Sequence, residues 1–521
     1  MSGNPSASGG QPARAAGTRA GDGPAGAGGS IRAAAPGEAL RAVRAALAGT
    51  PAWLVGGAPR DRALGRDTFD LDVVLDYASP ATAARAIARA AGGAACFELS
   101  EDFSGWRIVA RDRSWQVDVQ AMRGGSLAAD LSLRDFTVDA IAEPVAGGEP
   151  IYDPLGGLAD LAARRLRMVS PRAFADDPLR VLRLVRLSLD LGFDLDPDTA
   201  NAASLAAPDL RQVSGERVFM ELRRIIASPR VLDGLQLMDS LGITTVMLPE
   251  LDALHGVEQS RFHHRDVHGH TLEVLEHVIS LQVNPAAVLG DAELAAPVAA
   301  LLAEPLADEL TRGDALRWGA LLHDAAKPLT GATRPDRGVT FLGHDARGAA
   351  LARSVLERLR ASERLRAHVA ALVRHHLRLG FLVHEPEQPL ARRSVFAYLQ
   401  STAPVEVDVT LLSIADRLAG RSPIGRGDRA SESIDAHMRL AWSMLADALH
   451  WRTKGPPPPL YRGDELAAAL DIPTGPRLGE ILRELAAAQY AGEISTPEQA
   501  LVHARAFLDA SSMSSPPPNT S

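Results

Sequence analysis

The fold of this chain is decided by the stretch Leu54-Val55-Gly56-Gly57-Ala58-Pro59-Arg60-Asp61, which is followed by the run Phe69-Asp70-Leu71-Asp72-Val73-Val74-Leu75. The glycines at 56 and 57 let backbone N–H groups approach a triphosphate closely, and Arg60 adds a charged donor for its oxygens. In a strand, alternation places Asp70 and Asp72 on the same face, opposite the apolar side chains. Because two carboxylates on one face can hold Mg²⁺, the stretch predicts a site for a nucleoside triphosphate and its metal.

Each half of this pattern has an ordinary explanation when it is taken alone. Asp-x-Asp also occurs on solvated edge strands, and Gly-Gly also occurs in simple turns. Their succession within a short stretch favours the functional interpretation. A later strand-like run at 115–119 adds Asp118 as a third metal ligand or a general base, although a buried strand Asp capped by backbone donors explains it nearly as well.

A helix that begins next to Pro178 carries several arginines. Proline just inside a run of good helix formers marks a helix start. Arg180 and Arg183 are one turn apart and share a face, Arg186 lies to its side, and leucine and valine cover the core face. A solvated arginine face is the alternative explanation.

Further motifs follow in a fixed order between about residues 50 and 230. They are Leu133-Arg134-Asp135-Phe136-Thr137-Val138-Asp139-Ala140, Asp153-Pro154-Leu155-Gly156-Gly157, Asp176-Asp177-Pro178-Leu179-Arg180 and Ser214-Gly215-Glu216-Arg217. Together with the first stretch they resemble the nucleotidyltransferase head of the CCA-adding enzyme and bacterial poly(A) polymerase family. The chain departs from the family pattern at four positions, with Pro59 for Val, Leu133 for Arg, Asp139 for Asn and Asp176 for Glu.

The resemblance implies an α+β head like that of polymerase β, with a small mixed sheet, followed by an all-α neck, an HD domain and a helical C-terminal region. It implies Mg²⁺ on Asp70 and Asp72 and a triphosphate contact from Arg134. Asp177 and Arg180 fall on the positions that hydrogen-bond the incoming base in the family. A carboxylate beside a guanidinium matches the edges of cytosine and adenine but not those of uracil or guanine. The predicted nucleotide-binding residues are Gly56, Gly57, Arg60, Arg134, Asp177, Arg180, Arg183 and Arg186.

The function that the resemblance implies is metal-dependent addition of C and A residues, from CTP and ATP, to the 3′ end of tRNA. A poly(A) polymerase and an enzyme that adds only CC or only A are alternatives, because the same head motifs serve them all. A rival of another class is a metal-dependent HD phosphohydrolase whose head merely binds nucleotide or RNA. The departures at Leu133 and Asp139 keep this rival open.

A second group of polar residues occupies the middle of the chain. Ten of the fifteen histidines fall between residues 263 and 376, among them His263-His264, His344 and His375-His376. Histidine and aspartate are suitable ligands for a divalent metal that activates water on a phosphoester. The ordered set resembles that of HD-domain phosphohydrolases, which implies a second divalent metal, on His270, His323, Asp324 and Asp416. The alternative is that this domain serves mainly as a helical brace.

Composition is consistent with an intracellular multidomain enzyme. A chain of 521 residues with 46% hydrophobic content can bury several cores. One cysteine excludes internal disulfide bonds and suits the cytoplasm. The sequence contains no apolar run of about 18 residues and no signal segment, so neither membrane insertion nor secretion is expected. The net charge of −9 indicates that contact with RNA is local. The oligomeric state is not predicted.

Domain boundaries follow from shifts in composition and pattern. The termini are rich in small residues and Pro and are expected to be disordered, whereas Leu40 to Ala48 predicts a helix and residues 52–56, 69–76, 106–111 and 115–121 predict strands. Residues 431–511 include motifs that the family assigns to tRNA contact, with a plain helical cap as the alternative. The predicted regions are 1–34 (disordered), 35–195 (head), 196–258 (neck), 259–430 (HD domain), 431–511 (C-terminal helices) and 512–521 (disordered).

Overall fold

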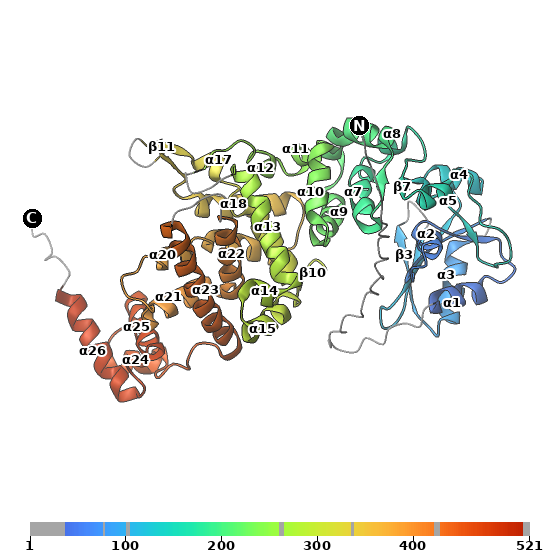
Figure 1. Cartoon of the computed structure of the whole chain (residues 1–521). Helices are drawn as coiled ribbons and strands as arrows, with labels where there is room; N and C mark the ends of the chain where they lie inside the picture. Colours follow the sequence, from blue (N-terminus) through green and yellow to red (C-terminus); the bar gives the residue numbers. More distant parts are fainter. Residues whose placement is uncertain are drawn as a thin grey trace, which may run out of the picture. The chain divides into compact units, whose positions relative to one another are not determined.

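The computed structural model describes residues 37–76, 79–100, 105–259, 265–334, 338–420 and 428–513 (Figure 1). Residues 1–34 and 514–521, most of the segments predicted to be disordered, lie outside these ranges, as do His263 and His264. The described chain divides into two compact units. Unit 1 contains the residues up to 131 and residues 139–154, and unit 2 contains residues 132–138 and 155 onward.

Unit 1 is an α/β structure built on a mixed sheet of six strands within the described residues. The strand order is β3-β4-β5-β2-β1-β6; β2 and β5 are parallel, and the other pairs are antiparallel. The strands are β1 (Ala52–Val55), β2 (Asp70–Leu75), β3 (Ala95–Ser100), β4 (Gly105–Val109), β5 (Gln116–Ala121) and β6 (Glu143–Pro144). The helices are α1 (Glu38–Ala46), α2 (Gly57–Ala63), α3 (Pro80–Ala90), α4 (Leu127–Ser132) and the 3₁₀ turn η1 (Thr137–Asp139), the last two of which reach the boundary with unit 2.

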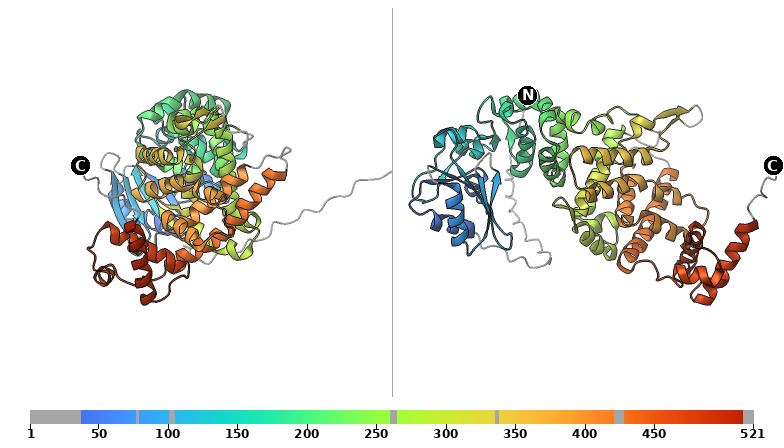
Figure 2. Two further views of the ribbon diagram at one scale, coloured as in Figure 1. Left: turned by 90° about the vertical axis from the view of Figure 1, so that its left-hand side faces the viewer. Right: turned by 180° about the vertical axis from the view of Figure 1, so that it is seen from behind.

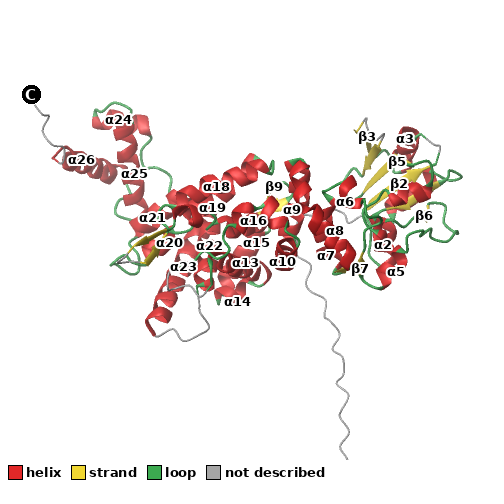
Figure 3. Ribbon diagram, turned by 90° about the horizontal axis from the view of Figure 1, so that it is seen from above, coloured by secondary structure: helices red, strands yellow, loops and turns green. Residues whose placement is uncertain are grey.

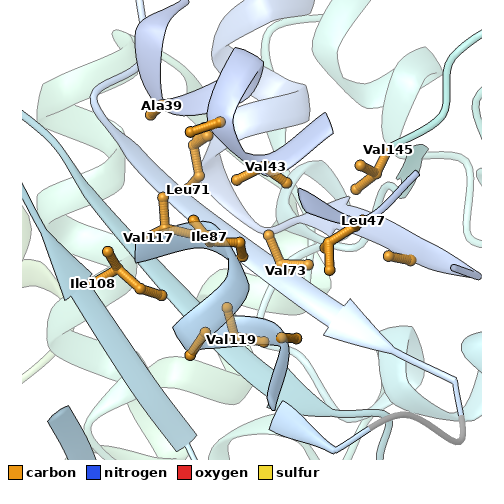
Figure 4. Close-up of a cluster of buried hydrophobic side chains, with 14 of the residues drawn as sticks. Ala39, Val43, Leu47, Leu71, Val73, Ile87, Ile108, Val117, Val119 and Val145 are labelled. Carbon is orange, nitrogen blue, oxygen red and sulfur yellow. The ribbon is translucent and has the colours of Figure 1, made fainter. Parts of the chain in front are cut away.

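The core of unit 1 lies between one face of this sheet and the helices α1 and α3 (Figure 4). Leu71 and Val73 of β2 and Val117 and Val119 of β5 point into it, and Ile87 of α3 packs against them. Since side chains alternate along a strand, the residues between these valines and leucines lie on the opposite face. The predicted alternation in β2 is therefore confirmed, and it leaves Asp70 exposed and Asp72 half-buried.

Unit 2 is built almost entirely of helices, as two further views show (Figure 2). Its first part comprises α5 (Gly157–Ala162), α6 (Ala173–Asp176), α7 (Arg180–Leu191), α8 (Pro197–Ala206), η2 (Ala207–Gln212), α9 (Gly215–Ala227), α10 (Val231–Ser240), α11 (Ile243–Met247) and α12 (Pro249–Asp252). In the described part of unit 2, three short strand pairs accompany the helices (Figure 3), namely β7 (Arg165–Leu166) with β8 (Asp194–Leu195), β9 (Pro305–Ala307) with β10 (Leu310–Thr311), and β11 (Ala332–Arg334) with β12 (Gly338–Thr340).

The middle and last parts of unit 2 contain its longest helices. The middle part comprises α13 (Val267–Val283), α14 (Pro285–Leu289), α15 (Ala292–Leu302), α16 (Arg312–Leu322), α17 (Lys327–Thr330), α18 (His344–Arg358), α19 (Glu363–His375), α20 (Arg378–Leu382), α21 (Arg392–Thr402) and α22 (Glu406–Ala419). The last part comprises α23 (Asp428–Lys454), α24 (Gly463–Leu470), α25 (Pro476–Tyr490) and α26 (Pro497–Met513), and α24 to α26 enclose a small core of their own. None of the helices in the described residues is long and apolar enough to span a bilayer.

The unit boundary differs from the boundary predicted for the head. The sequence motifs place the end of the head at residue 195, whereas the compact α/β unit ends at residue 154. Residues 155–195 form α5 to α7 and pack within the helical unit. Asp196, which follows the predicted end of the head, caps α8 by accepting a hydrogen bond from the Thr199 backbone N–H at 3.2 Å.

Candidate active and metal sites

The Gly56-Gly57 turn joins β1 to α2 in unit 1. Gly56 has φ of +70° and ψ of −136°, a conformation that side chains with a Cβ rarely adopt. The glycine at this position is therefore required by the backbone, as well as permitting close approach of a phosphate. Strand β1 pairs with β2 in a register that places Val55 opposite Asp72, so the turn follows directly beside the carboxylate strand.

Arg60 is held by two carboxylates. Its Nε donates to Asp61 Oδ1 at 2.9 Å, and its Nη1 donates to Asp139 Oδ1 at 2.5 Å. Burial lowers the pKa of Arg60, but the charges of Asp139 and Asp61 outweigh burial and raise the pKa above its ordinary value. Asp139 is one of the departures from the family pattern. Its carboxylate carries a charge that Asn lacks, and it binds Arg60, the residue predicted to contact the triphosphate.

Three aspartates lie on the face of the sheet opposite the core. Asp72 of β2 lies directly beside Asp118 of β5 in the parallel register, and Asp70 lies two residues earlier on the same face. Arg107 of β4 donates to both oxygens of Asp118, at 2.7 and 2.6 Å. The hydrogen bond to Asp118 raises the pKa of Arg107, and the charges of Asp70 and Asp72 add to this effect. Asp118 is thus fixed by a side chain rather than by backbone donors.

The chemistry of this face fits Mg²⁺. The ion is often held by one or two protein carboxylates while substrate phosphates and water complete its octahedral shell. Asp70 and Asp72 offer such carboxylates on the exposed side of the sheet. Among the described residues, the groups of three or more ligands that converge without any substrate all lie in unit 2.

The two predicted base-reading residues of unit 2 are both fixed by hydrogen bonds. Asp177 accepts from Arg217 of α9 at 2.8 Å and from the Leu179 backbone N–H at 3.2 Å. Arg180 donates to the backbone carbonyls of Ala173 and Leu133, at 2.9 and 2.6 Å. Burial lowers the pKa of Arg180. The departure at Leu133 does not remove this support, because the contact uses the main chain.

The remaining predicted arginines occupy different environments. Arg183 donates to Asp135 Oδ2 at 2.7 Å. Arg134, which precedes Asp135 in the sequence, is half-buried. Arg186 is buried and donates to Glu221 of α9 at 2.6 Å and to Asp190 at 2.9 Å. Arg186 therefore joins α7 to α9. The sequence pattern placed Arg186 beside the arginine face but did not reveal its buried partner Glu221.

The four predicted HD residues come together inside unit 2. His270 of α13 lies with its Nε2 at 2.9 Å from Asp416 Oδ1 and at 3.9 Å from Asp324 Oδ2. His323 Nε2 lies at 3.1 Å from Asp324 Oδ2. Burial raises the pKa of Asp324, but the charges of His323 and Lys327 outweigh it and hold the pKa well below its usual range.

Two further histidines, which the sequence showed without assigning a role, complete this cluster. His344 Nε2 and His376 Nε2 lie 3.2 Å apart, and they lie at 3.3 and 3.9 Å from the other oxygen of Asp324. Asp324 therefore stands between His270 with His323 on one side and His344 with His376 on the other. Burial, with the charge of His323, lowers the pKa of His376 to about 4.

The tautomers of these histidines suit metal binding. The Nδ1 atoms of His323, His344 and His376 lie at 2.8, 2.6 and 2.7 Å from the backbone carbonyls of Ala320, Phe341 and Val373. A carbonyl accepts only, so each Nδ1 donates its proton to the main chain, and each Nε2 faces Asp324, where a bound metal would take the place of a proton. Such contacts behind a ligand orient it for a metal. Two groups of three side chains could each hold one ion, and both groups include Asp324.

Comparisons with known families agree with this arrangement. The family described as "Poly A polymerase head domain" matches residues 52–167, "Probable RNA and SrmB-binding site of polymerase A" matches residues 192–254, and "HD domain" matches residues 267–421. Solved structures with similar folds include a CCA-adding enzyme of Thermotoga maritima complexed with tRNA, with a TM-score of 0.57 at 17% identity, covering 92% of this chain and 97% of that chain. A CCA-adding enzyme in complex with ATP has a TM-score of 0.58 at 16% identity, covering 90% of this chain and 95% of that chain.

Curated relatives match over nearly the whole length. The A-adding tRNA nucleotidyltransferase of Deinococcus radiodurans is 37% identical over 88% of this chain and 94% of its own length. The CC-adding tRNA nucleotidyltransferase of Thermus thermophilus is 35% identical over 88% of this chain and 93% of its own length. The multifunctional CCA protein of Halorhodospira halophila is 35% identical over 62% of this chain and 72% of its own length. With its head motifs and its HD cluster in the family order, the chain belongs to the tRNA nucleotidyltransferase family.

Proposed function

We propose that this enzyme adds C and A residues, from CTP and ATP, to the 3′ end of tRNA in the cytoplasm. The observation that carries the proposal is the pairing of Asp70 and Asp72 on the open face of β2 with the Gly56-Gly57 turn at the end of the adjacent strand. One element offers ligands for a hard cation and the other offers main-chain N–H groups to phosphate.

The reaction joins the RNA 3′ oxygen to the α-phosphorus of the nucleoside triphosphate and breaks the bond from the α-phosphorus to the bridging oxygen, so that pyrophosphate leaves. Mg²⁺ held by Asp70 and Asp72 would lower the pKa of the hydroxyl and neutralise charge on the pyrophosphate. Asp118 is our candidate to accept the hydroxyl proton or to act as a third ligand. Arg107 holds that carboxylate in place through two hydrogen bonds.

The choice of base is assigned to Asp177 and Arg180. Their contacts with Arg217 and with the carbonyls of Ala173 and Leu133 fix one side of each group. Fixed donors and acceptors discriminate between bases because a wrong base leaves them unpaired. Gly56, Gly57, Arg60, Arg134 and Arg183 are proposed to bind the nucleotide together with them.

An enzyme that adds only A or only CC is the second candidate. It is favoured by one observation, which is that the two relatives matching 88% of this chain are named for these partial activities. The HD cluster supports a further activity, metal-dependent hydrolysis of a phosphoester, because its histidine and aspartate side chains are suited to an ion that activates water.

The test uses purified protein with Mg²⁺ and tRNA transcripts that end before CCA, after C and after CC. CTP and ATP are supplied singly and together, and products are resolved at single-nucleotide resolution. Addition of CCA followed by a stop supports the main proposal, whereas CC alone, A alone or a long A tail identifies a sibling activity. No addition to any acceptor would overturn the proposal and would direct attention to the HD site.

The same assay tests the carboxylates. We expect Asp70→Asn to lower the rate of addition on the order of 10³-fold, because a neutral amide holds Mg²⁺ poorly. Asp67→Asn is the matched control, since Asp67 is exposed and lies just before β2. Equal rates for the two variants would contradict the assignment of Asp70.

A further inference from the structure

A third cluster of potential ligands lies outside both sites described above. It consists of Asp239 at the end of α10, His255 in the turn after α12, and His268 in the first turn of α13 (Figure 1). His268 is buried, whereas the side chains of Asp239 and His255 are 29% and 49% exposed. The cluster therefore has one closed side and one side open to water.

The backbone around this cluster is fixed by hydrogen bonds. The N–H groups of Val267 and His268 donate to the carbonyls of Val257 and Leu254, at 3.0 and 3.3 Å. Asp266 caps α13 with one oxygen and accepts from the Gly256 N–H with the other, at 2.8 Å each. The turn and the helix start thus form one unit, which holds the rings of His255 and His268 stacked with their centroids 3.6 Å apart.

The distances within the cluster match ligands of one ion better than they match hydrogen bonds. Asp239 Oδ2 lies at 3.7 Å from His268 Nε2 and at 4.0 Å from His255 Nε2. Both separations exceed the range of an N–H···O hydrogen bond. A tetrahedral zinc ion with ligands at roughly 2.0–2.2 Å separates its ligand atoms by about 3.4 Å. Binding of one ion would therefore need Asp239 to approach by a few tenths of an ångström and the two stacked imidazole rings to turn apart.

The local charge also favours a cation. Asp239 lies in the last turn of α10, where the carbonyl end of the helix carries partial negative charge. Asp266 is close enough to interact with both imidazoles. A positive ion between the imidazoles and Asp239 would offset this concentration of negative charge.

We propose that Asp239, His255 and His268 form a binding site for a divalent ion of the zinc type. The ligand atoms are Asp239 Oδ2 and the Nε2 atoms of the two histidines, and a water molecule on the open side completes the tetrahedron. Two imidazoles and one carboxylate are a ligand set that zinc accepts. The bound ion links α10 to the start of α13, the helix that carries His270 of the HD cluster, and its role is to fix that helix start.

The experiment measures zinc per full-length chain by elemental analysis after equilibration with a low concentration of free Zn²⁺. We expect His255→Ala and Asp239→Asn each to lose about one zinc ion per chain relative to the parent protein. His450→Ala is the matched control, because His450 is an exposed histidine on α23 outside the three ligand groups. Asp324→Ala removes the ligand shared by the HD groups, so its loss of metal should add to that of His255→Ala.

A second measurement separates metal binding from a change in packing. Zn²⁺ should raise the melting temperature of the Asp324→Ala protein and should not raise that of the Asp324→Ala, His255→Ala protein, while the two should melt at similar temperatures in chelator. Equal zinc content in the parent and His255→Ala proteins would overturn the proposal. A zinc-induced rise in melting temperature that survives His255→Ala in the Asp324→Ala background would do the same.

Discussion

Two residues that depart from the family pattern make specific contacts in this chain. Asp139 replaces Asn and forms an ion pair with Arg60, and Leu133 replaces Arg and still supports Arg180 through its backbone carbonyl. In the first case the substitution changes the charge beside a nucleotide-binding candidate, and in the second the main chain preserves the contact. A departure from a motif therefore has to be judged by which atom makes the contact.

Arg180 provides the test of base choice at the residue scale. We expect Arg180→Ala to reduce discrimination of CTP and ATP against UTP and GTP by about 10²-fold, because the site loses the donors that reject a wrong base edge. Arg180→Lys should behave similarly, since it keeps the charge but loses the planar fork. Single-nucleotide kinetics with all four triphosphates measure the ratios of kcat/KM.

Arg172→Ala is the matched control for Arg180. Arg172 lies on the same segment, but its side chain is 83% exposed and pairs only with Asp176 among the contacts described. Its removal should leave the four ratios unchanged. Unchanged ratios in Arg180→Ala as well would contradict the assignment of base choice to that residue.

The sequence pattern predicted four residues of the HD cluster but not the two further histidines that complete it. His270, His323, Asp324 and Asp416 have a recognisable order, and the structure brings them together. His344 begins α18 and His376 directly follows α19, and only the fold shows that both face the second oxygen of Asp324. Sequence spacing carries no signal for such a contact, because it depends on how α18 and α19 pack.

At the scale of elements, the strands that the sequence predicted are those with the clearest pattern of buried residues. The strands near 52–56, 69–76, 106–111 and 115–121 were predicted from runs of apolar residues, and each of them buries at least two residues. Strand β3 was missed because Ala95, Phe97 and Leu99 are exposed at the edge of the sheet, so no face of it is consistently buried. Strand β6 has two residues and shows no period at all.

The pairing of α16 with α22 gives a stability prediction at this scale. Arg312 donates to both oxygens of Asp408, and the Asp408 side chain is fully buried. Burial raises the pKa of Asp408, but the neighbouring His368 and Arg312 outweigh it and lower the pKa. We expect Asp408→Asn to cost about 3–5 kcal/mol in the free energy of unfolding at neutral pH, because it leaves the Arg312 charge buried without its partner.

The effect of Asp408 should depend on pH with a definite sign. A depressed carboxyl pKa stabilises the fold above the unfolded pKa of about 3.9, and that contribution is lost as the pH falls through the folded pKa. Denaturant titrations at several pH values should therefore show the gap between parent and Asp408→Asn narrowing below about pH 4. Asp233→Ala breaks an exposed pair with Arg230 and should cost less than about 1 kcal/mol. A gap that stays constant down to low pH would contradict the assignment.

At the scale of the whole molecule, motif order and packing divide the chain differently. The base-reading motif belongs by sequence to the head, yet residues 155–195 pack with the helical unit, and so does the segment 132–138 that contains Arg134 and Asp135. Phe136 packs against Phe174 there, and Asp135 binds Arg183. The residues proposed to bind the metal and those proposed to read the base thus lie in different compact units, a division that no compositional shift in the sequence marks.

This division predicts that the two chemical sites can be disabled separately. The carboxylates of unit 1 and the HD cluster of unit 2 share no described ligand, so Asp324→Asn should remove metal from the HD cluster while leaving the rate of nucleotide addition within about twofold of the parent. Asp70→Asn should do the reverse. Metal content, addition rate and circular dichroism are measured on both variants. If a folded Asp324→Asn protein lost nucleotide addition, the two sites would be coupled, and the HD cluster would have to be counted as part of the machinery of addition.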